Sequence, residues 1–192
     1  LMKSTPKSLR LHIALFGRTN VGKSSFLNLM TGQDVSIVSE QPGTTTDVVE
    51  KTMELLPIGP VVFIDTAGLD DQTVLGSKRV EKTEKVFDRA DIILLVCEGT
   101  QFGTFEQAVE ERAAEKNIPL IKIANKADLY DVSDPSDFLL ANSTDLTSRE
   151  DTLSRLKHQL IAMCPEEFIQ PPPLVGDLIR PGDIAVLIVP ID

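Results

Sequence analysis

The sequence predicts an α/β fold in which helices cover both faces of a mostly parallel, six-stranded sheet. Short apolar runs recur along the chain, and several are continuous rather than alternating, as in strands buried on both faces; they lie at 11–16, 61–65, 91–96, 119–124 and 138–141. Stretches with helical periodicity separate them, at 23–30, 77–90, 104–117 and 149–163. Strand and helix therefore alternate, which is the pattern of a parallel sheet with crossover helices.

One connection departs from this alternation. Residues 48–56 form a strand pattern that reaches the strand at 61–65 through only the four residues PIGP, 57–60. This connection is too short for a crossover helix. We therefore expect the two strands to pair antiparallel, with 48–56 at an edge of the sheet.

Length and composition favour one globular domain with an aliphatic core. The chain has 192 residues, 42% of them apolar, with no Trp and one Tyr. Its formal net charge of −10 disfavours general binding to nucleic acid or to anionic membranes. No signal peptide is visible, and no apolar run approaches the roughly 20 residues of a membrane span. Cys97 and Cys164 have no metal-ligand spacing, which favours a reducing, cytoplasmic setting with Cys97 as a buried free thiol.

Residues 1–164 make up the predicted domain, and the composition changes after them. The proline-rich stretch 165–174 predicts an extended linker. Residues 175–192 contain another apolar strand pattern and predict the truncated start of a second, β-containing domain. The alternative is a tail that packs on the first domain.

A glycine-rich loop follows the first predicted strand. Residues 17–24, GRTNVGKS, match Gly-x-x-x-x-Gly-Lys-Ser between a strand and a helix, where backbone N–H groups and a helix N-terminus can hold phosphates. Lys23 is predicted to reach the β- and γ-phosphates, and Ser24 to ligate Mg²⁺. The predicted nucleotide-binding residues are Gly17, Arg18, Thr19, Asn20, Val21, Gly22, Lys23, Ser24 and Ser25. Whether Arg18 also acts as an arginine finger or is a surface charge stays open.

Two further motifs concern the metal and the base. The sequence DTAG, 65–68, ends a strand, so Asp65 is predicted in the Mg²⁺ shell and the Gly68 N–H on a γ-phosphate. The sequence NKAD, 125–128, ends another strand. Asp128 can accept two hydrogen bonds from guanine, and adenine lacks that donor pair, so ATP would leave a buried carboxylate unpaired. Lys126 is predicted to cover the base and Asn125 to brace the loop.

The segment PGTTTD, 42–47, lies between the first helix and the antiparallel strand. One hydroxyl there is predicted to complete the Mg²⁺ shell only when the γ-phosphate is present, which gives the loop an ordered and a released state.

With these motifs in order over about residues 9–163, the chain resembles a translation-factor-class GTPase. The resemblance implies the Ras-like G domain of the P-loop NTPases, with GTP, GDP and Mg²⁺ as cofactors, and it is strongest to tRNA-modification and ribosome-assembly GTPases. In that subgroup the Mg²⁺ threonine corresponds to Thr45, and the degenerate fifth motif corresponds to Ala141-Asn142-Ser143, so Asn142 and Ser143 are expected at the base. An asparagine at the position of Asn20 ligates K⁺ there, although Asn20 could instead merely suit the loop backbone.

The resemblance also implies how GTP is hydrolysed. Ras-like enzymes orient the attacking water with a glutamine where this chain has Leu69. We therefore expect slow intrinsic hydrolysis that K⁺ stimulates, with Lys23, Thr45, Gly68 and Asn20 as the catalytic set. The acidic residues Asp70, Asp71 and Glu81 are either water-orienting bases or simply solvated.

Residues 35–47, 53–71 and 177–192 are similar to the HydF family of [FeFe]-hydrogenase maturation GTPases. This resemblance implies a GTP-driven switch in metallocluster maturation, with other maturation proteins as partners and a homodimer formed through the downstream domain. The alternative is a tRNA-modification or ribosome-assembly GTPase, and a third hypothesis is a GTP-binding module without turnover. The net charge of −10 and the residues after 174 favour the first hypothesis.

Overall fold

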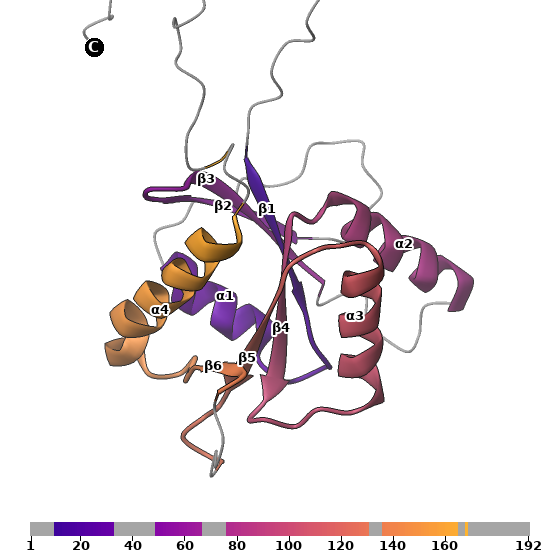
Figure 1. Ribbon diagram of the computed structural model, residues 1–192. Helices are drawn as coiled ribbons and strands as arrows, with labels where there is room; N and C mark the ends of the chain where they lie inside the picture. The colour runs from indigo at the N-terminus through magenta and orange to yellow at the C-terminus, as the bar shows by residue number, and fades with distance from the viewer. Residues whose placement is uncertain (1–9, 33–48, 67–75, 131–135, 165–167, 169–192) are drawn as a thin grey trace, which may run out of the picture.

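The computed structural model describes residues 10–32, 49–66, 76–130, 136–164 and 168. They form one six-stranded sheet, in the order β2-β3-β1-β4-β5-β6, with helices on both faces (Figure 1). The strands are β1 (Leu11–Phe16), β2 (Val49–Leu55), β3 (Gly59–Asp65), β4 (Ile92–Glu98), β5 (Leu120–Asn125) and β6 (Phe138–Leu140). The helices are α1 (Lys23–Thr31), α2 (Gly76–Arg89), α3 (Thr104–Glu115) and α4 (Arg149–Met163), with a 3-10 turn η2 (Leu146–Ser148) before α4.

The strand pairing is parallel throughout except at one edge. β1 pairs with β3 and β4, β4 with β5, and β5 with β6, all parallel. β2 pairs antiparallel with β3, from Val49 opposite Asp65 to Leu55 opposite Gly59. The predicted mixed sheet, including its antiparallel edge strand, is confirmed.

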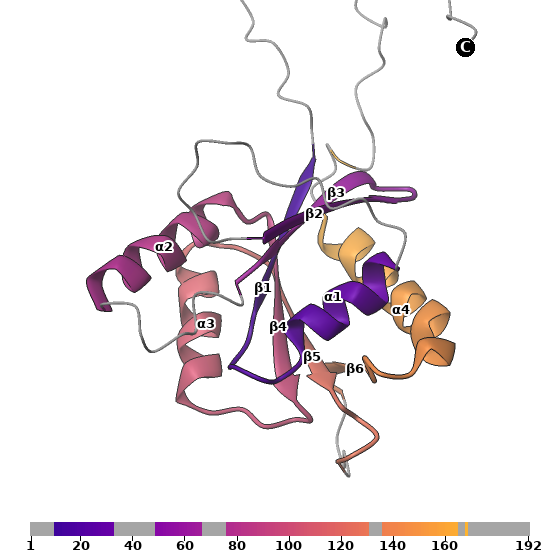
Figure 2. The same ribbon diagram turned by 180° about the vertical axis from the view of Figure 1, so that it is seen from behind.

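Helices α1 and α4 cover one face of the sheet, and α2 and α3 cover the other (Figure 1, Figure 2). Two apolar clusters fill the layers between the sheet and these helix pairs. β4 lies at the centre, and its residues Ile92 to Cys97 are all buried, which explains why this run is continuous rather than alternating. Cys97 is a fully buried free thiol, as predicted.

Surface ion pairs join α2 to α3 in addition to their apolar contacts with the sheet. Arg112 pairs with Glu84 and with Glu115, each at 2.6 Å. Lys116 pairs with Asp88 at 2.6 Å and with Glu84 at 3.4 Å. The hydrogen bond from Arg112 is the main reason that the pKa of the Glu84 carboxyl lies below its ordinary value.

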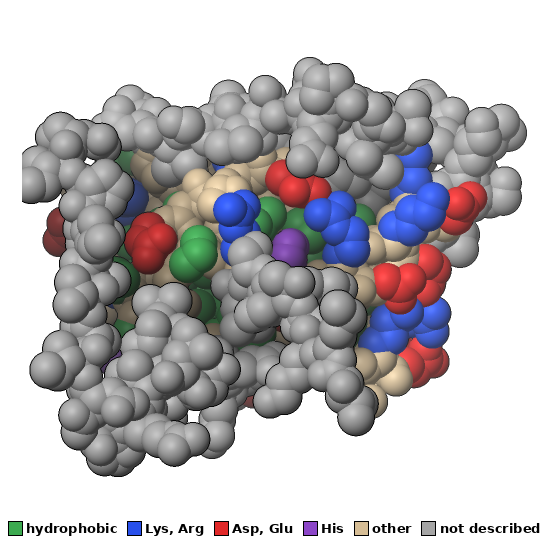
Figure 3. All heavy atoms as spheres, turned by 90° about the horizontal axis from the view of Figure 1, so that it is seen from above, with side chains coloured by type: hydrophobic (Ala, Val, Ile, Leu, Met, Phe, Trp, Pro, Cys, Tyr) green, Lys and Arg blue, Asp and Glu red, His purple; other side chains and the backbone are tan. Residues whose placement is uncertain are grey.

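Basic and acidic side chains are interspersed on the face seen from the end where β1 begins, and the described residues of that face form no broad area of one charge (Figure 3). None of the described helices is long and apolar enough to span a bilayer. The predicted linker 165–174 and the predicted second domain 175–192 lie outside the described residues, apart from Phe168, which packs against the cluster under α1 and α4.

Candidate nucleotide-binding site

The loop between β1 and α1 packs tightly against the ends of β4 and β5. Gly17 and Gly22 have φ of 157° and 93°. A Cβ on Gly17 would collide with the carbonyl oxygen of Val96, and a Cβ on Gly22 would collide with the side-chain amide of Asn125. These positions therefore need glycine for close approach as well as for backbone conformation.

Lys23, the first residue of α1, folds back into this loop. Its Nζ donates to the carbonyl oxygens of Gly17 at 2.5 Å and of Arg18 at 2.9 Å, and the residue is only 5% exposed. A buried ammonium thus lies at the N-terminus of a nine-residue helix, where the helix dipole is also positive. This combination suits a polyphosphate.

Ser24 and Asp65 come together at the rim of the loop. The Ser24 hydroxyl donates to Asp65 Oδ2 at 3.0 Å. Asp65 ends β3 and is buried, whereas Ser24 is exposed. One hydroxyl and one carboxylate are oxygen ligands of the kind that Mg²⁺ takes beside substrate phosphates, so the residues present fit that ion.

Asn125 joins three loops at this edge of the sheet. Its Nδ2 donates to the Val21 carbonyl oxygen at 2.8 Å, in the glycine-rich loop. Its Oδ1 accepts from the N–H and the hydroxyl of Ser143, at 3.2 and 2.6 Å, in the loop after β6. The asparagine is 1% exposed. The glycine-rich loop, the 125–128 turn and the loop of the degenerate fifth motif therefore lie side by side.

Lys126, the second residue of the 125–128 turn, has a left-handed conformation with φ 56°. Lys126 Nζ and the Tyr130 hydroxyl both donate to Glu98 Oε1, each at 2.9 Å. The two hydrogen bonds hold the pKa of the Glu98 carboxyl below its ordinary value. The bond between the Tyr130 hydroxyl and Glu98 also raises the pKa of Tyr130. Asp128 is exposed, so the carboxylate that we expect to be buried against guanine faces solvent here.

Glu98 and Tyr130 are not among the residues that the sequence motifs predict at the site. The available signals were the place of Glu98 at the end of a buried strand, next to a glycine, and the place of Tyr130 two residues after NKAD. Neither signal specifies that the two side chains meet.

The Arg18 carbonyl oxygen belongs to the loop contacts described above, but its guanidinium pairs outside the loop, with Glu106 of α3 at 2.6 Å. The same Glu106 oxygen accepts the Gly103 N–H at 2.9 Å at the start of α3, and Glu106 is 1% exposed. Thr19, Asn20 and Ser25 are exposed.

Asn20 has φ 66°, and asparagine adopts this conformation more readily than most other residues. Its side chain has no hydrogen-bond partner among the described residues. The backbone therefore gives the asparagine a reason to be there that does not involve K⁺.

The remaining predicted residues divide into two groups. Thr45 and Gly68 lie outside the described residues, as do Leu69, Asp70 and Asp71. Glu81 lies on α2 and pairs with Lys85 at 2.8 Å on the exposed surface. Asn142 accepts from the N–H and the hydroxyl of Thr144, at 3.1 and 2.7 Å, and so stabilises its own turn.

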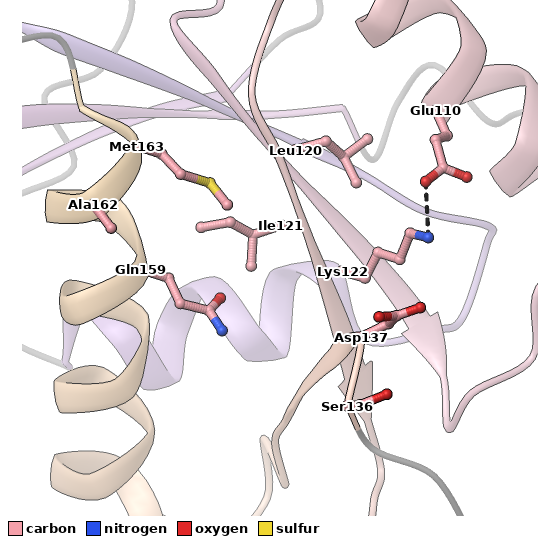
Figure 4. Close-up of a pocket in the computed structure, with 9 residues that line it drawn as sticks. All are labelled: Glu110, Leu120, Ile121, Lys122, Ser136, Asp137, Gln159, Ala162 and Met163. Carbon is pink, nitrogen blue, oxygen red and sulfur yellow. Dashed lines mark ion pairs between the residues drawn. The ribbon is translucent and has the colours of Figure 1, made fainter.

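A separate cavity of about 430 Å³ lies beside the first half of β5 (Figure 4). Lys122 and Glu110 pair across 2.8 Å on one side of it, and Gln159 and Met163 of α4 lie on the other. The cavity shares no residue with the loops described above.

Comparison with known proteins identifies the family. The model of the family described as "50S ribosome-binding GTPase" matches residues 12–126, more than half of the chain. The tRNA modification GTPase MnmE of Prochlorococcus marinus (strain NATL1A) is 40% identical over 120 residues, which are 62% of this chain and 26% of that protein. GTPase Der of Kosmotoga olearia is 37% identical over 125 residues, which are 62% of this chain and 28% of that protein. The chain thus spans about a quarter of the length of these relatives.

Solved structures share the fold. The G domain of the T. maritima iron transporter FeoB superposes with a TM-score of 0.59 at 19% identity. The match covers 82% of this chain and 100% of the FeoB chain. Era in complex with MgGDPNP and a fragment of 16S ribosomal RNA has a TM-score of 0.59 at 23% identity and covers 88% of this chain and 60% of that chain. The predicted P-loop G-domain fold is confirmed, and the chain belongs to the 50S ribosome-binding GTPase family.

Proposed function

We propose that this domain is a molecular switch that binds GTP and GDP and hydrolyses GTP slowly on its own. The observation that carries the proposal is the set of hydrogen bonds made by Asn125, because it brings the phosphate loop and the 125–128 turn to one edge of the sheet. A single nucleotide can therefore place its phosphates at Lys23 and its base at Asp128.

The choice of base is the most direct test. Asp128→Asn replaces an acceptor of two guanine hydrogen bonds by an amide that suits xanthine instead. Two hydrogen bonds to a charged group at about 1.5 kcal/mol or more each correspond to a loss of roughly a hundredfold in GDP affinity. Calorimetric titration with GDP and XDP measures the ratio, and Asp151→Asn on the exposed face of α4 is the matched control. An unchanged ratio of GDP to XDP affinity would contradict the proposed binding mode.

The phosphates and Mg²⁺ are assigned to the glycine-rich loop and its neighbours. Ser24, Asp65 and Thr45 would hold Mg²⁺, which neutralises charge on the phosphates, and the Gly68 N–H would contact the γ-phosphate. Ser24→Ala is expected to weaken GDP binding in Mg²⁺ and to leave binding in excess EDTA unchanged. Equal losses in both buffers would remove Ser24 from the metal site.

In this proposal K⁺ stimulation depends on the side chain of Asn20. That role can be tested separately from the fit of asparagine to the left-handed backbone at position 20. Asn20→Gly keeps the left-handed conformation and removes the amide oxygen, whereas Asn20→Ala removes both. If Asn20 ligates K⁺, GTP turnover in the wild type is faster in K⁺ than in Na⁺, and both variants lose the difference. Retained stimulation in Asn20→Gly would show that only the backbone conformation matters.

Single-turnover GTP hydrolysis distinguishes a slow enzyme from a binding module without turnover.

For the biological role, the relatives support tRNA modification or ribosome assembly better than hydrogenase maturation. MnmE is a tRNA modification GTPase, and Era has been solved in complex with ribosomal RNA. The net charge of −10 opposes unspecific nucleic-acid binding, but this argument does not extend to a specific RNA partner. A cytoplasmic location would be consistent with this role.

Hydrogenase maturation is the second candidate, because residues 35–47, 53–71 and 177–192 are similar to HydF. This role would add other maturation proteins as partners and a homodimer formed through a downstream domain. A strain that lacks the protein separates the two roles. Altered nucleosides in its tRNA or defective ribosomal subunits would support the first, and loss of [FeFe]-hydrogenase activity alone would support the second.

A further inference from the structure

Three side chains, which we name the Glu98 cluster, connect the 125–128 turn to the end of β4. They are Glu98, Lys126 and Tyr130. One oxygen of Glu98, Oε1, accepts from Lys126 Nζ and from the Tyr130 hydroxyl, each at 2.9 Å. Only Lys126 belongs to the nucleotide motifs, so the other two residues have no role in the function proposed above.

The ends of two neighbouring strands build this cluster. Glu98 of β4 and Asn125 of β5 are register partners, and the Gly99 N–H donates to the Asn125 carbonyl oxygen at 2.8 Å. Lys126 follows in its left-handed conformation, and its ammonium reaches back to β4. The Tyr130 ring lies on Gly99, where an added Cβ would come within 2.8 Å of the ring. A side chain at position 99 would therefore displace Tyr130.

We propose that Glu98 and Tyr130 are positioning residues that hold the Lys126 side chain ready to cover the guanine base. They raise nucleotide affinity without touching the nucleotide. The inference rests on the proposed function, because it takes the 125–128 turn as the guanine site.

The physical basis is the conformational entropy of lysine. A free lysine side chain populates many rotamers, and a base that packs on its stem must restrict them during binding. The hydrogen bond from Lys126 Nζ to Glu98 restricts these rotamers before the nucleotide binds. The hydrogen bond from the Tyr130 hydroxyl holds the Glu98 carboxylate in place for Lys126. Because Lys126 and Glu98 are 32% and 33% exposed, water screens the pair, and the expected effect on affinity is about two- to fivefold.

The test compares two conservative variants of the 192-residue chain by calorimetric titration with GDP. Tyr130→Phe removes one hydroxyl and keeps the ring on Gly99, and Glu98→Gln removes the charge and keeps the shape. We expect GDP affinity to fall about twofold in the first and about three- to fivefold in the second. Asp151→Asn, which removes a carboxylate from the exposed 2.8 Å pair with Arg155, is expected to change nothing.

Two further measurements separate positioning from a general structural effect. In a Lys126→Met background, Tyr130→Phe should have no effect on GDP affinity, since the side chain to be positioned is gone. Tyr130 is also the only tyrosine and there is no tryptophan, so tyrosinate absorbance reports on this cluster alone. The Glu98 hydrogen bond raises the pKa of Tyr130, and Glu98→Gln should lower that pKa toward its ordinary value.

The outcomes are distinguishable. If the wild type binds GDP but both variants keep its affinity, or if Tyr130→Phe weakens binding equally with and without Lys126, the positioning role is wrong and the proposed function stands. Tighter binding by the variants would mean that Glu98 holds Lys126 away from the base, which also overturns the inference. If the wild type binds no guanine nucleotide, the proposed function fails, and this inference fails with it.

Discussion

Replacement of Asn125 by alanine is expected to lower the free energy of unfolding of the nucleotide-free protein by about 3 kcal/mol. The change removes three hydrogen bonds, each with a net value of about 1 kcal/mol. They are the 2.8 Å bond to the Val21 carbonyl and the 3.2 and 2.6 Å bonds from Ser143. Because position 125 is 1% exposed, water has little access to the groups left without a partner.

Urea unfolding followed by circular dichroism measures this loss. A change of about 3 kcal/mol is a large part of the roughly 5–15 kcal/mol of a typical domain. For a chain of this size it should lower Tm by roughly 6–12 °C. Circular dichroism follows the whole sheet and its helices, so it reports global unfolding.

Two companion variants calibrate the result. Ser143→Ala removes only the hydroxyl bond and keeps the N–H bond, so it should cost about 1 kcal/mol. Asn28→Ala changes an exposed asparagine on α1 that accepts one hydrogen bond from Lys51, and it should stay within about 0.5 kcal/mol. A loss below about 1 kcal/mol in Asn125→Ala would refute the idea that this side chain holds the three loops together.

Three other predictions follow from single contacts. Burial raises the pKa of the Cys97 thiol to about 12. The stabilisation from its neutral form is therefore complete below pH 9 and is lost as the pH rises toward 12. Cys97→Ala should make the midpoint of urea unfolding less dependent on pH over that range. Arg149 donates at 2.7 and 3.2 Å to two carbonyls at the end of α1, so Arg149→Met should cost about 1–2 kcal/mol in urea unfolding. Glu106→Gln keeps an acceptor for the Gly103 N–H and should destabilise the protein less than Glu106→Ala in thermal melts; equal melting temperatures would contradict that role of the carboxylate.

The sheet could be predicted from the sequence because strand patterns and the lengths of the connections between strands are local features. The four residues 57–60 are too few for a crossover, and this alone specified an antiparallel partner for β3. Motif order also predicts the glycine-rich loop, the end of β3 and the 125–128 turn at the carboxyl ends of three strands of the parallel part of the sheet, β1, β3 and β5. In a parallel sheet those ends share one edge.

Contacts between side chains that are far apart in the sequence could not be predicted from residue type and spacing. Arg18 and Glu106 are 88 positions apart, and nothing in the spacing of either residue marks the other. The Glu98 cluster depends on the left-handed backbone of Lys126, which residue type alone does not predict. Ser143 was placed at the base only by analogy, whereas the structure gives it two hydrogen bonds to Asn125.

The ion pairs between α2 and α3 have a practical consequence for any potassium experiment. Glu84, Asp88, Arg112 and Lys116 all lie at the surface, where charge attraction decays over about 8 Å at physiological ionic strength and over shorter distances in stronger salt. A titration that simply adds KCl therefore changes two variables. One is the occupancy of the proposed K⁺ site, and the other is the strength of the ion pairs between α3 and α2, the helix that follows residues 67–75. Exchange of K⁺ against Na⁺ at constant total salt changes only the first.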